Sequence, residues 1–508
     1  MARIQPLTLS RRAFLGAALI GMSCKSRRGP AGRLIDDGGA RGHQLRSPIA
    51  AGERRPTERK PVVIVGGGVA GLSAAWRLRQ RGFTDFVVLE MEQRAGGNAR
   101  WGENEVTPFP WAAHYVPVPG PEATDLRAFF RDIGVLNGEE WSERALCFAP
   151  QERLYIHGRW QEGLEPQIGP SDRDRDQFKR FDDRMQAFRE SGAFTIPSSR
   201  GRASQPHDIS ALDTVSMAGW MDREGFDSPY LRWWIEYGCR DDYGALMPDV
   251  SAWAGIHYHT SRQDDEPGPL TWPEGNGWIV RKLLERLAPH VETSVMVERL
   301  EPNDRGWTIT ADTGVWTAEQ VIYAAPAFLL PHLTGGAIAI DGFDYSPWVT
   351  ANLVLDRWPR SSAGEPAWDN VIFDSPGLGY VVATHQSIAT DVPRTVWTYY
   401  WALAHGTPPA NRAWLQQQTW ETLSARILGD LRRVHRDIDD CVSRIDVLRL
   451  GHAMIRPSVG FLSRAARQRM AGAGKGLLFA HSDVSGLSLF EEAHAGGVRA
   501  ADAALAAL

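Results

Sequence analysis

The chain of 508 residues is 43% hydrophobic and 23% charged, which is enough apolar sequence for a large core and predicts two or three domains. Residues 1–60 carry 13 Lys or Arg against 4 Asp or Glu, a net charge of +9, so the total of −5 leaves −14 for the rest; this acidic body argues against nucleic acid as the main partner. The four cysteines show no CxxC spacing, which argues against a zinc site or a redox dithiol and leaves a disulfide open in an oxidising compartment.

The first element in the chain is predicted to be an export signal. Ser10-Arg11-Arg12-Ala13-Phe14-Leu15 leads into a short apolar run that ends at Met22. This arrangement resembles a twin-arginine signal, which implies export of a folded protein by the twin-arginine machinery and a periplasmic or exported location. The apolar run is shorter than the roughly 18 residues that a stable membrane span needs, so we expect no permanent transmembrane anchor. The alternative for residues 1–24 is a basic tail without a targeting role.

A lipid anchor is a second hypothesis for this segment. Cys24 follows Gly21-Met22-Ser23, which resembles a lipoprotein box in which Gly21 replaces the usual Leu. Lipidation at Cys24 would tether the exported protein to a membrane. Residues 25–60 are rich in Gly, Arg and Pro and are predicted to be a flexible linker outside the fold.

A dinucleotide-binding βαβ unit is predicted from residue 61. The β-branched run 61–65 leads directly into a glycine-rich turn and then into a helical pattern through Arg81. Gly66 permits the tight turn, Gly68 lets the backbone approach a pyrophosphate, and Gly71 lets the helix pack closely on the sheet. A side chain at Gly68 should therefore block the cofactor.

The start of this helix is predicted to hold phosphate groups. The backbone N–H groups near Val69 and Ala70 and the positive end of the helix dipole point at the ligand. The second strand, 86–89, ends in Glu90, which lies 19 residues after Gly71. A carboxylate at this place can accept hydrogen bonds from the hydroxyls of the adenosine ribose.

The segment after Glu90 identifies the type of dinucleotide. Residues 90–97 resemble the acid-to-RxGG segment of the flavin-containing amine oxidases and their relatives, the phytoene desaturases and protoporphyrinogen oxidases. The resemblance implies FAD and carries three residues over as cofactor-side residues: Arg94, Gly96 and Gly97. The chain departs from the family at Glu92 and Asn98, where amine oxidases usually have Arg.

The C-terminal residues supply an independent match. Residues 476–483 are an apolar strand that ends in an acid, and Phe490-Glu491-Glu492 then opens a helix. The resemblance implies that Asp483 contacts the ribityl chain and pyrophosphate, and that the helix start at Phe490 and Glu491 faces the pyrimidine side of the flavin. His481 and Glu492 stand where glycines are common; they either crowd or tune the flavin or are ordinary polar residues.

A middle segment completes the implied cofactor domain. Residues 293–300, 307–311 and 320–326 are similar to the family segment that returns to the nucleotide sheet, and Val297 matches the valine whose backbone faces the adenine. The implied fold class is α/β, with a Rossmann-like FAD-binding domain of the GxGxxG type and an interleaved α+β substrate domain. The predicted segments are a signal (1–24), a linker (25–60), three FAD-binding parts (61–120, 266–345 and 451–508) and two substrate parts (a helical cap, 121–265, and 346–450).

The chain has no second strand-GxGxxG-helix unit that would bind NAD(P)H. We therefore predict that the electrons come from a small-molecule substrate that is oxidised directly. Amine oxidases commonly carry a Lys bridged by water to the flavin. The best match to their strand is 348–355, with Ala351 or Asn352 at the lysine position. The missing lysine favours desaturation or another dehydrogenation over simple amine oxidation by oxygen.

Two segments supply candidate substrate residues. His114 lies in Trp111-Ala112-Ala113-His114-Tyr115, where the family's segment over the flavin usually runs; it is the candidate catalytic residue, and the alternative is a core histidine bonded to backbone. The polar cluster at 240–244 either grips a polar substrate or is a solvated turn, and the loop 272–277 is predicted to be architectural.

Three functions follow from these observations. The leading hypothesis is an exported FAD-dependent oxidoreductase that oxidises a C–N or C–C bond of a small organic substrate by hydride transfer to the flavin. The alternatives are a desaturase or isomerase of a lipid-like substrate and a flavin-binding partner protein without turnover. No metal is implied.

Overall fold

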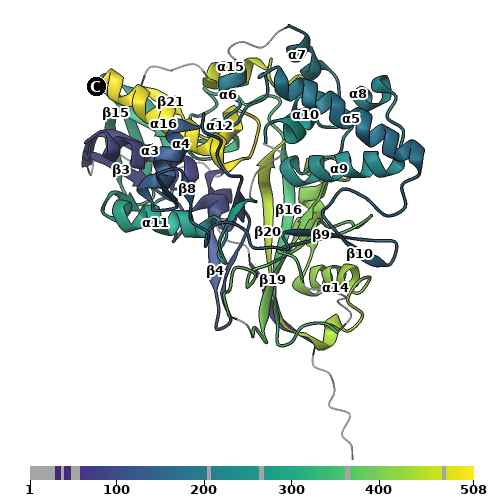
Figure 1. The fold of residues 1–508 in the computed structure, drawn as a ribbon. Helices are drawn as coiled ribbons and strands as arrows, with labels where there is room; N and C mark the ends of the chain where they lie inside the picture. Colours follow the sequence, from purple (N-terminus) through teal and green to yellow (C-terminus); the bar gives the residue numbers. More distant parts are fainter. Residues whose placement is uncertain are drawn as a thin grey trace, which may run out of the picture.

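The computed structural model describes residues 29–35, 39–46, 58–202, 207–262, 268–360, 366–389, 391–471 and 476–508. The predicted signal and the hypothetical lipid anchor at Cys24 lie outside these residues. Within them, no helix is long and apolar enough to cross a membrane, and Cys147, Cys239 and Cys441 are buried free thiols. In Figure 1 the nucleotide-binding elements lie on the left, the long strands of the substrate sheet run through the middle, and the cap helices lie at the upper right.

The nucleotide sheet is assembled from three separate parts of the chain. Its order is β12-β3-β2-β15-β14-β13, and β21 also pairs with β15. The strands are β2 (Glu58–Val65), β3 (Phe86–Leu89), β12 (Val291–Glu292), β13 (Val297–Asn303), β14 (Gly306–Ala311), β15 (Val315–Tyr323) and β21 (Leu477–Phe479). Strands β12, β3, β2, β15 and β21 pair in parallel, and their apolar runs are buried because both faces of such a sheet are covered.

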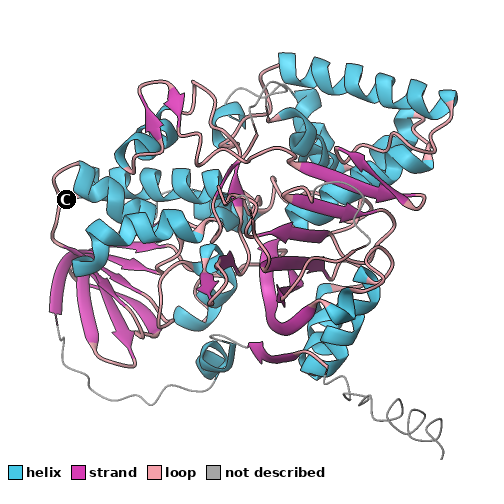
Figure 2. Ribbon diagram, turned by 60° about the horizontal axis from the view of Figure 1, so that its bottom comes forward, coloured by secondary structure: helices cyan, strands magenta, loops and turns pink. Residues whose placement is uncertain are grey.

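Helix α3 (Val69–Gln80) follows the glycine turn and packs against α16 (Phe490–Ala507) and α11 (Gly277–Leu287). Figure 2 shows helices lying across one face of the fanned nucleotide sheet. The two helix backbones of α3 and α16 meet at Gly497, where a Cβ atom would lie 2.3 Å from the Ala70 carbonyl oxygen. The glycine there brings the C-terminal helix against the start of α3.

The substrate domain is built on an eight-stranded mixed sheet of order β1-β20-β16-β19-β18-β17-β9-β10. The strands are β1 (Ala31–Ile35), β9 (Glu152–Ile156), β10 (Arg159–Glu162), β16 (Tyr345–Leu355), β17 (Asp369–Ile372), β18 (Gly379–Val382), β19 (Thr395–Ala402) and β20 (Val442–Ile455). Small two-stranded sheets pair β4 (Trp101–Glu103) with β5 (Pro108–Pro110), β6 (Tyr115–Val116) with β11 (Leu270–Thr271), and β7 (Leu136–Asn137) with β8 (Glu140–Trp141).

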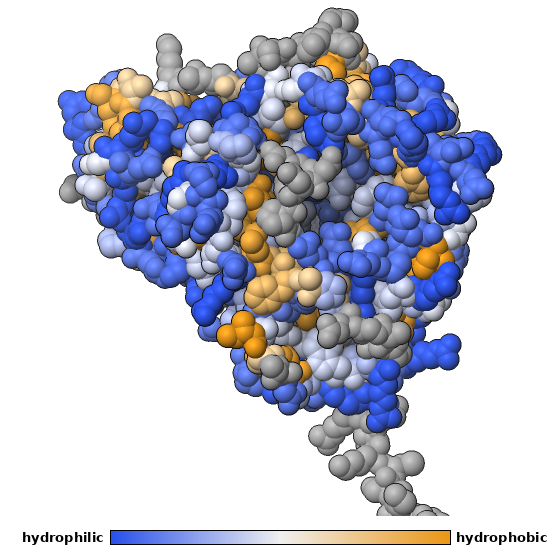
Figure 3. Space-filling view, viewed as in Figure 1, coloured by the Kyte–Doolittle hydropathy of each residue, from blue (hydrophilic) through white to orange (hydrophobic). Residues whose placement is uncertain are grey.

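The cap helices begin at serine residues that satisfy the free amides of the first turn. Ser171 forms a capping box at the start of α5 (Asp172–Glu190), and Ser216, Ser228 and Ser251 cap α8 (Met217–Glu224), α9 (Pro229–Tyr243) and α10 (Ala252–Thr260). The other α-helices are α2 (Gly39–Gly42), α4 (Thr124–Asp132), α6 (Ser199–Arg202), α7 (His207–Ala211), α12 (Leu330–Leu333), α13 (Pro408–Gln417), α14 (Trp420–Leu431) and α15 (Ala465–Ala471). In Figure 3 hydrophilic side chains cover most of the face seen in Figure 1, and apolar ones gather in a band near its middle.

The predicted flexible linker at 25–60 is wrong for residues 29–35 and 39–46, which we call the N-terminal strap, and for residues 58–60, which begin β2. Strand β1 pairs in parallel with β20, with Ala31 opposite Arg444, and so forms an edge of the substrate sheet. The Arg41 guanidinium donates hydrogen bonds to the carbonyl oxygens of Met91 (2.6 Å) and Ser294 (2.7 Å) and pairs with Asp312. A Gly- and Arg-rich composition predicts a tether, but here the segment is ordered by partners from other parts of the chain, which range from Met91 to Arg444.

Candidate active site

Three of the four glycines between the end of β2 and the first turn of α3 have different surroundings. Gly66 has a φ of +104°, which favours glycine, and a Cβ atom on Gly71 would lie 1.9 Å from the Gly66 carbonyl oxygen. A Cβ atom on Gly68 would instead meet nothing closer than the Gly97 Cα, at 3.8 Å. The protein's own packing therefore requires Gly66 and Gly71, whereas Gly68 opens onto free space.

The start of α3 presents free donors to this space. The Leu72 amide makes the first bond of the helix, to the Gly68 carbonyl oxygen at 2.9 Å, so the amides of residues 69–71 lie outside the helix's own hydrogen bonds. Gly68, Val69 and Ala70 line a cavity of about 740 Å³. Unpaired amides at a helix N-terminus form a binding site for phosphate groups.

Glu90, at the end of β3, is buried beside the turn. Its Oε2 accepts a hydrogen bond from the Gly67 amide at 2.7 Å, and its Oε1 accepts one from the Glu92 amide at 2.8 Å. Burial raises the pKa of the Glu90 carboxyl, and these two amides oppose the shift. Each carboxylate oxygen keeps further acceptor capacity, and Glu90 lines the large cavity.

Most of the predicted cofactor residues lie around this cavity. Those that line it are Gly66, Gly68, Val69, Ala70, Glu90, Gly97, Val297, Asp483 and Phe490. Gly71 and Gly96 are not among the lining residues; Gly96 supports the turn from behind, because its amide donates to the Gly67 carbonyl oxygen at 2.9 Å. Arg94 is exposed and also does not line the cavity, whereas Arg100 lines it and donates to the Gly97 carbonyl oxygen at 2.9 Å.

At the C-terminal side, Asp483 is buried and anchored. Its Oδ2 accepts hydrogen bonds from the Ala327 amide (2.8 Å) and the Tyr345 hydroxyl (2.7 Å). His481 lines the large cavity and accepts from the Asp483 amide at 3.1 Å. Glu492 lines neither described cavity; its carboxylate accepts from the Ser198 amide at 2.5 Å, so it holds a cap loop.

The N-terminal strap supplies cavity residues that the sequence did not predict: Gly39, Gly42, His43, Leu45 and Arg46 line the large cavity. No motif marks them, because they reach the cavity only through the pairing of β1 and the anchoring of Arg41.

A second cavity, of about 150 Å³, adjoins the first. The residues that line both are Asn98, Ala113, Asn276, Leu450, Ala453, Ser488, Leu489 and Phe490. Asn276 comes from the loop that was predicted to be architectural, and its amide group donates to the Tyr115 carbonyl oxygen at 3.0 Å. A small ligand in the second cavity would face a larger ligand in the first across this shared wall.

His114 lies in the wall of the second cavity. Its Nδ1 is 3.2 Å from the Ala112 carbonyl oxygen, and its ring stacks on Tyr400 with a centroid distance of 4.6 Å. Burial lowers the pKa of the imidazole to about 4, so the ring is neutral at pH 7. His114 is bonded to backbone, as the alternative hypothesis describes, and it lines the cavity; its catalytic role stays a prediction.

The polar cluster at 240–244 divides between two roles. Asp241 and Asp242 line the second cavity, together with Asp369, Glu491 and the guanidinium of Arg262. Glu491, which was predicted on the cofactor side, does not line the large cavity. Arg240 takes no part in the lining; it donates to the carbonyl oxygens of Ser375 (3.2 Å), Pro376 (2.7 Å) and Gly377 (2.8 Å). The helix that carries the two acids is thus fastened to the loop between β17 and β18.

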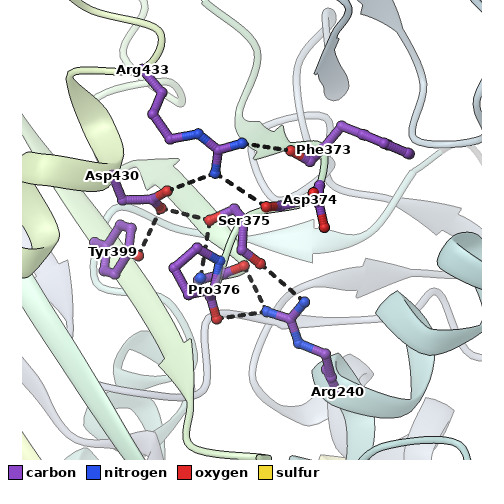
Figure 4. A network of polar contacts seen from close by, with 9 residues as sticks. Arg240, Phe373, Asp374, Ser375, Pro376, Tyr399, Asp430 and Arg433 are labelled. Atoms are coloured by element: carbon purple, nitrogen blue, oxygen red, sulfur yellow. Dashed lines mark hydrogen bonds and ion pairs between the residues drawn. The ribbon is translucent and has the colours of Figure 1, made fainter.

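Figure 4 shows the polar network around this loop. The Asp430 carboxylate accepts from the hydroxyls of Ser375 (2.6 Å) and Tyr399 (2.9 Å) and from Arg433 (3.1 Å). These groups come from α14, the residues that follow it, β19 and the loop, so the network fixes the far side of the small cavity, where Leu378 forms part of the wall.

The strand that matches the lysine-bearing strand of amine oxidases is β16. Asn352 does not face the cavity: it donates to the Pro110 carbonyl oxygen at 3.1 Å and accepts from the Thr398 hydroxyl at 2.7 Å. Trp348 and Thr350, earlier on this strand, line the second cavity. Among the described residues, no lysine lines either cavity.

Known proteins share this fold. The family described as NAD(P)-binding Rossmann-like domain matches residues 64–133. The L-amino acid oxidase Lm29 of Lachesis muta is 25% identical over 272 residues, 52% of this chain and 49% of that protein, so the chain matches about half of that relative's length.

Solved structures match more of the chain. A putrescine oxidase double mutant superposes with a TM-score of 0.70 at 18% identity, covering 89% of this chain and 100% of that one. A CLA-producing fatty acid isomerase from P. acnes superposes with a TM-score of 0.64 at 14% identity, covering 87% and 97%. The predicted fold class, a Rossmann-like nucleotide domain with an interleaved substrate domain, is confirmed.

Proposed function

We propose that this chain, which has the fold of the flavin-containing amine oxidases, is an FAD-dependent oxidoreductase that oxidises a C–N bond of a small organic substrate. One observation carries the proposal: a cavity that begins at the open face of Gly68 adjoins a small cavity lined by acidic and aromatic side chains. The first suits a dinucleotide, and the second suits a substrate at its end.

The residues present fit FAD. The space over Gly68 is open to a ligand. A Cβ atom added to Gly68 would enter this space, and its nearest protein atom would be the Gly97 Cα at 3.8 Å. Free amides at the start of α3 suit a pyrophosphate, and Glu90 retains acceptor capacity for ribose hydroxyls. The volume of about 740 Å³ lies within the usual range for cofactor sites.

In this arrangement, residues are in place to bind each part of the cofactor. The turn at 66–71 would hold the pyrophosphate, Val297 the adenine, Asp483 the ribityl side, and the start of α16 the pyrimidine end. When bound, FAD supplies the two-electron acceptor for oxidation of the substrate.

The chain's own side chains prepare the substrate. His114, Tyr400 and Trp348 surround the small cavity with apolar ring surface, which excludes water from the shared wall. Because the His114 imidazole is neutral at pH 7, it does not repel a cationic substrate. The carboxyl groups opposite it attract one.

The alternative of a desaturase or isomerase acting on a lipid-like substrate is favoured by the fold it shares with a fatty acid isomerase and by the missing lysine. The lining of the small cavity disfavours it, because four carboxyl groups are a costly surface for an acyl chain.

The test is the absorption spectrum of the purified protein followed by anaerobic addition of amines, amino acids and polyenes. We expect a flavin spectrum that bleaches with amines. Bleaching with polyenes alone would support the lipid alternative, and a flavin that no compound bleaches would support the non-catalytic flavin-binding protein. Natively folded protein that stays colourless after addition of FAD would overturn the proposal.

We also propose export by the twin-arginine route, on the strength of the Arg11-Arg12 segment. Replacement of both arginines by lysine should retain the protein in the cytoplasm, as measured by fractionation. The mass of the mature N-terminus would distinguish a free exported protein from one lipidated at Cys24. Normal export of the lysine variant would contradict the proposal.

A further inference from the structure

The small cavity has more negative than positive groups in its wall. Four carboxyl groups line it, those of Asp241, Asp242, Asp369 and Glu491, and the only lining guanidinium or ammonium group among the described residues is that of Arg262. If all of them are ionised, the wall has a surplus of three negative charges. Charged groups are rarely buried without a counter-charge, so the surplus points to a ligand.

Among the described residues, Arg262 forms an ion pair with only one of the four, Asp242. Its Nη2 lies 3.3 Å from both carboxylate oxygens of Asp242 and 3.4 Å from the Tyr115 hydroxyl oxygen. Its guanidinium also stacks over Tyr258, 4.8 Å from the ring centroid. Asp242 therefore has a cation of its own, and the other three carboxyl groups do not share it closely.

Glu491 is the clearest example of a carboxyl group in this cavity without a paired cation among the residues described. It is 4% exposed and lines the cavity, and its carboxylate has no ion pair or hydrogen bond with another described residue. Burial raises its pKa to about 7. A buried carboxyl group with such a pKa is partly protonated at pH 7. A bound cation favours its ionised form, so binding of the cation releases the proton.

Asp241 and Asp369, on the substrate-domain side, are two further cavity acids that form no ion pair with a described residue. Asp241 comes from the end of α9 and Asp369 from the first residue of β17. Burial is the main cause that raises the pKa of each carboxyl, to about 7 for Asp241, and the charge of Asp241 adds to the shift of Asp369. Neither residue lines the large cavity, whereas Phe490, next to Glu491, lines both.

We propose that the enzyme is selective for amines with a second positive charge, whose distal cationic group binds between Asp241 and Asp369 while the amine to be oxidised lies toward Glu491 and the shared wall. This inference rests on the proposed function. The cavity of about 150 Å³ restricts the ligand to a short chain. Two sources offer this chemistry: an aliphatic diamine, and a basic amino acid whose carboxylate would face Arg262.

Matched substrates test the inference. The rate of anaerobic flavin reduction divided by the apparent Kd is compared for 1,4-diaminobutane against n-butylamine, and for L-ornithine against L-norvaline. We expect the doubly charged member of at least one pair to be favoured by about tenfold or more, the value of one good charge contact. Preference within the first pair indicates a diamine, and within the second a basic amino acid. Equal rates within both pairs would overturn the inference.

Variants locate the selectivity. Asp241→Asn and Asp369→Asn, which keep the side-chain shape, should each reduce the preference to about threefold or less, whereas Asp176→Asn on the exposed face of α5 should leave it unchanged. Flavin content and melting temperature verify that each variant is folded. A preference that survives both cavity substitutions would also contradict the inference.

A binding measurement separates this inference from the proposed function. Calorimetry of 1,4-diaminobutane and of L-ornithine at pH 7, in two buffers of different ionisation heat, should show proton release on binding of the preferred ligand, because the raised-pKa acids ionise. If both ligands bind with proton release but no amine reduces the flavin, the proposed activity fails and the cation site stands. If some amine reduces the flavin but neither ligand releases protons on binding, the activity stands and the cation site fails.

Discussion

The backbone amide of Gly67 donates a hydrogen bond of 2.7 Å to the Glu90 carboxylate, which joins the glycine turn to the end of the neighbouring strand. The amide of Glu92 holds the other oxygen of the same carboxylate at 2.8 Å. Because both bonds come from the protein itself, the turn and the acid are placed before any cofactor binds. Preorganisation of this kind reduces the entropy that binding must overcome.

Replacing Glu90 by Gln should weaken FAD binding by about 10- to 100-fold, because an amide group can accept from only one of the two backbone donors and loses the charge. Fluorescence titration of the apoprotein with FAD measures the Kd. Glu103→Gln, at an exposed position on β4, is the matched control. Unchanged affinity in the Glu90 variant would remove this carboxylate from the binding site.

Two alanine substitutions in the turn should have opposite outcomes. Gly68→Ala should fold normally but lose most of its flavin, because its Cβ atom has space in the protein and projects where a pyrophosphate would lie. Gly71→Ala should lower the free energy of unfolding by about 3 kcal/mol or more, because its Cβ atom would overlap the Gly66 carbonyl oxygen. Urea unfolding and flavin absorbance distinguish them. A Gly68 variant that keeps its full content of bound flavin would show that the phosphates lie elsewhere.

The N-terminal strap should slow the release of the cofactor. Arg41→Ala removes the hydrogen bonds to Met91 and Ser294 and the pairing with Asp312, so the strap should leave the cavity more often. We expect FAD to dissociate about threefold to tenfold faster, equivalent to about 1 kcal/mol for partly exposed contacts. Stopped-flow dilution of the holoprotein measures the rate, with Arg33→Ala on β1 as the control. Equal dissociation rates would show that the strap does not retain the cofactor.

Arg240→Lys should destabilise the protein although it keeps the charge. A lysine cannot reproduce the fork that binds three carbonyl oxygens at 375–377, and unpaired buried carbonyl groups cost about 1–3 kcal/mol each. We expect a loss of about 2–4 kcal/mol in the free energy of unfolding and a raised KM, since the adjacent Asp241 shifts. Arg223→Lys, at an exposed position on the neighbouring helix α8, should change neither quantity. A stable Arg240 variant with normal KM would leave the loop without a role in positioning the acids.

The stability of Asp241→Asn relative to the parent should increase with pH. Burial raises the pKa of Asp241 to about 7 in the folded protein, above the ordinary value of 3.8 that holds in the unfolded chain. The cost of ionising Asp241 in the fold is therefore absent below about pH 4, grows as the pH rises, and is fully present above about pH 7. The asparagine variant does not have this cost, because its side chain does not ionise.

Urea unfolding of both proteins at pH 5 and pH 8 measures the effect. The comparison between variant and parent cancels the buried histidines, whose lowered pKa values act in the opposite direction. We expect the difference in the free energy of unfolding to change by on the order of 1 kcal/mol in favour of the variant at pH 8. A difference that is constant with pH would mean that Asp241 titrates near its ordinary value.

Local features of the nucleotide half could be predicted from sequence alone. The strand, glycine turn, helix and closing acid at 61–90 depend on neighbours within about thirty residues, and the structure places β3 on the predicted residues 86–89. His114 and the acids at 241 and 242 were also among the predicted polar groups, since polar residues between apolar runs are conspicuous. Their alternatives could not be separated, because the facing groups come from other parts of the chain.

The amino-acid sequence is enough to predict the dinucleotide turn, because glycine geometry and a helix N-terminus specify a phosphate site locally. Only the folded chain shows that the strap is ordered, that Thr350 and not Asn352 lines the small cavity, and that Asp369, Arg262 and Glu491 meet Asp241 in its wall. These outcomes depend on strand pairing and packing between separate parts of the chain, and local sequence patterns do not specify such contacts.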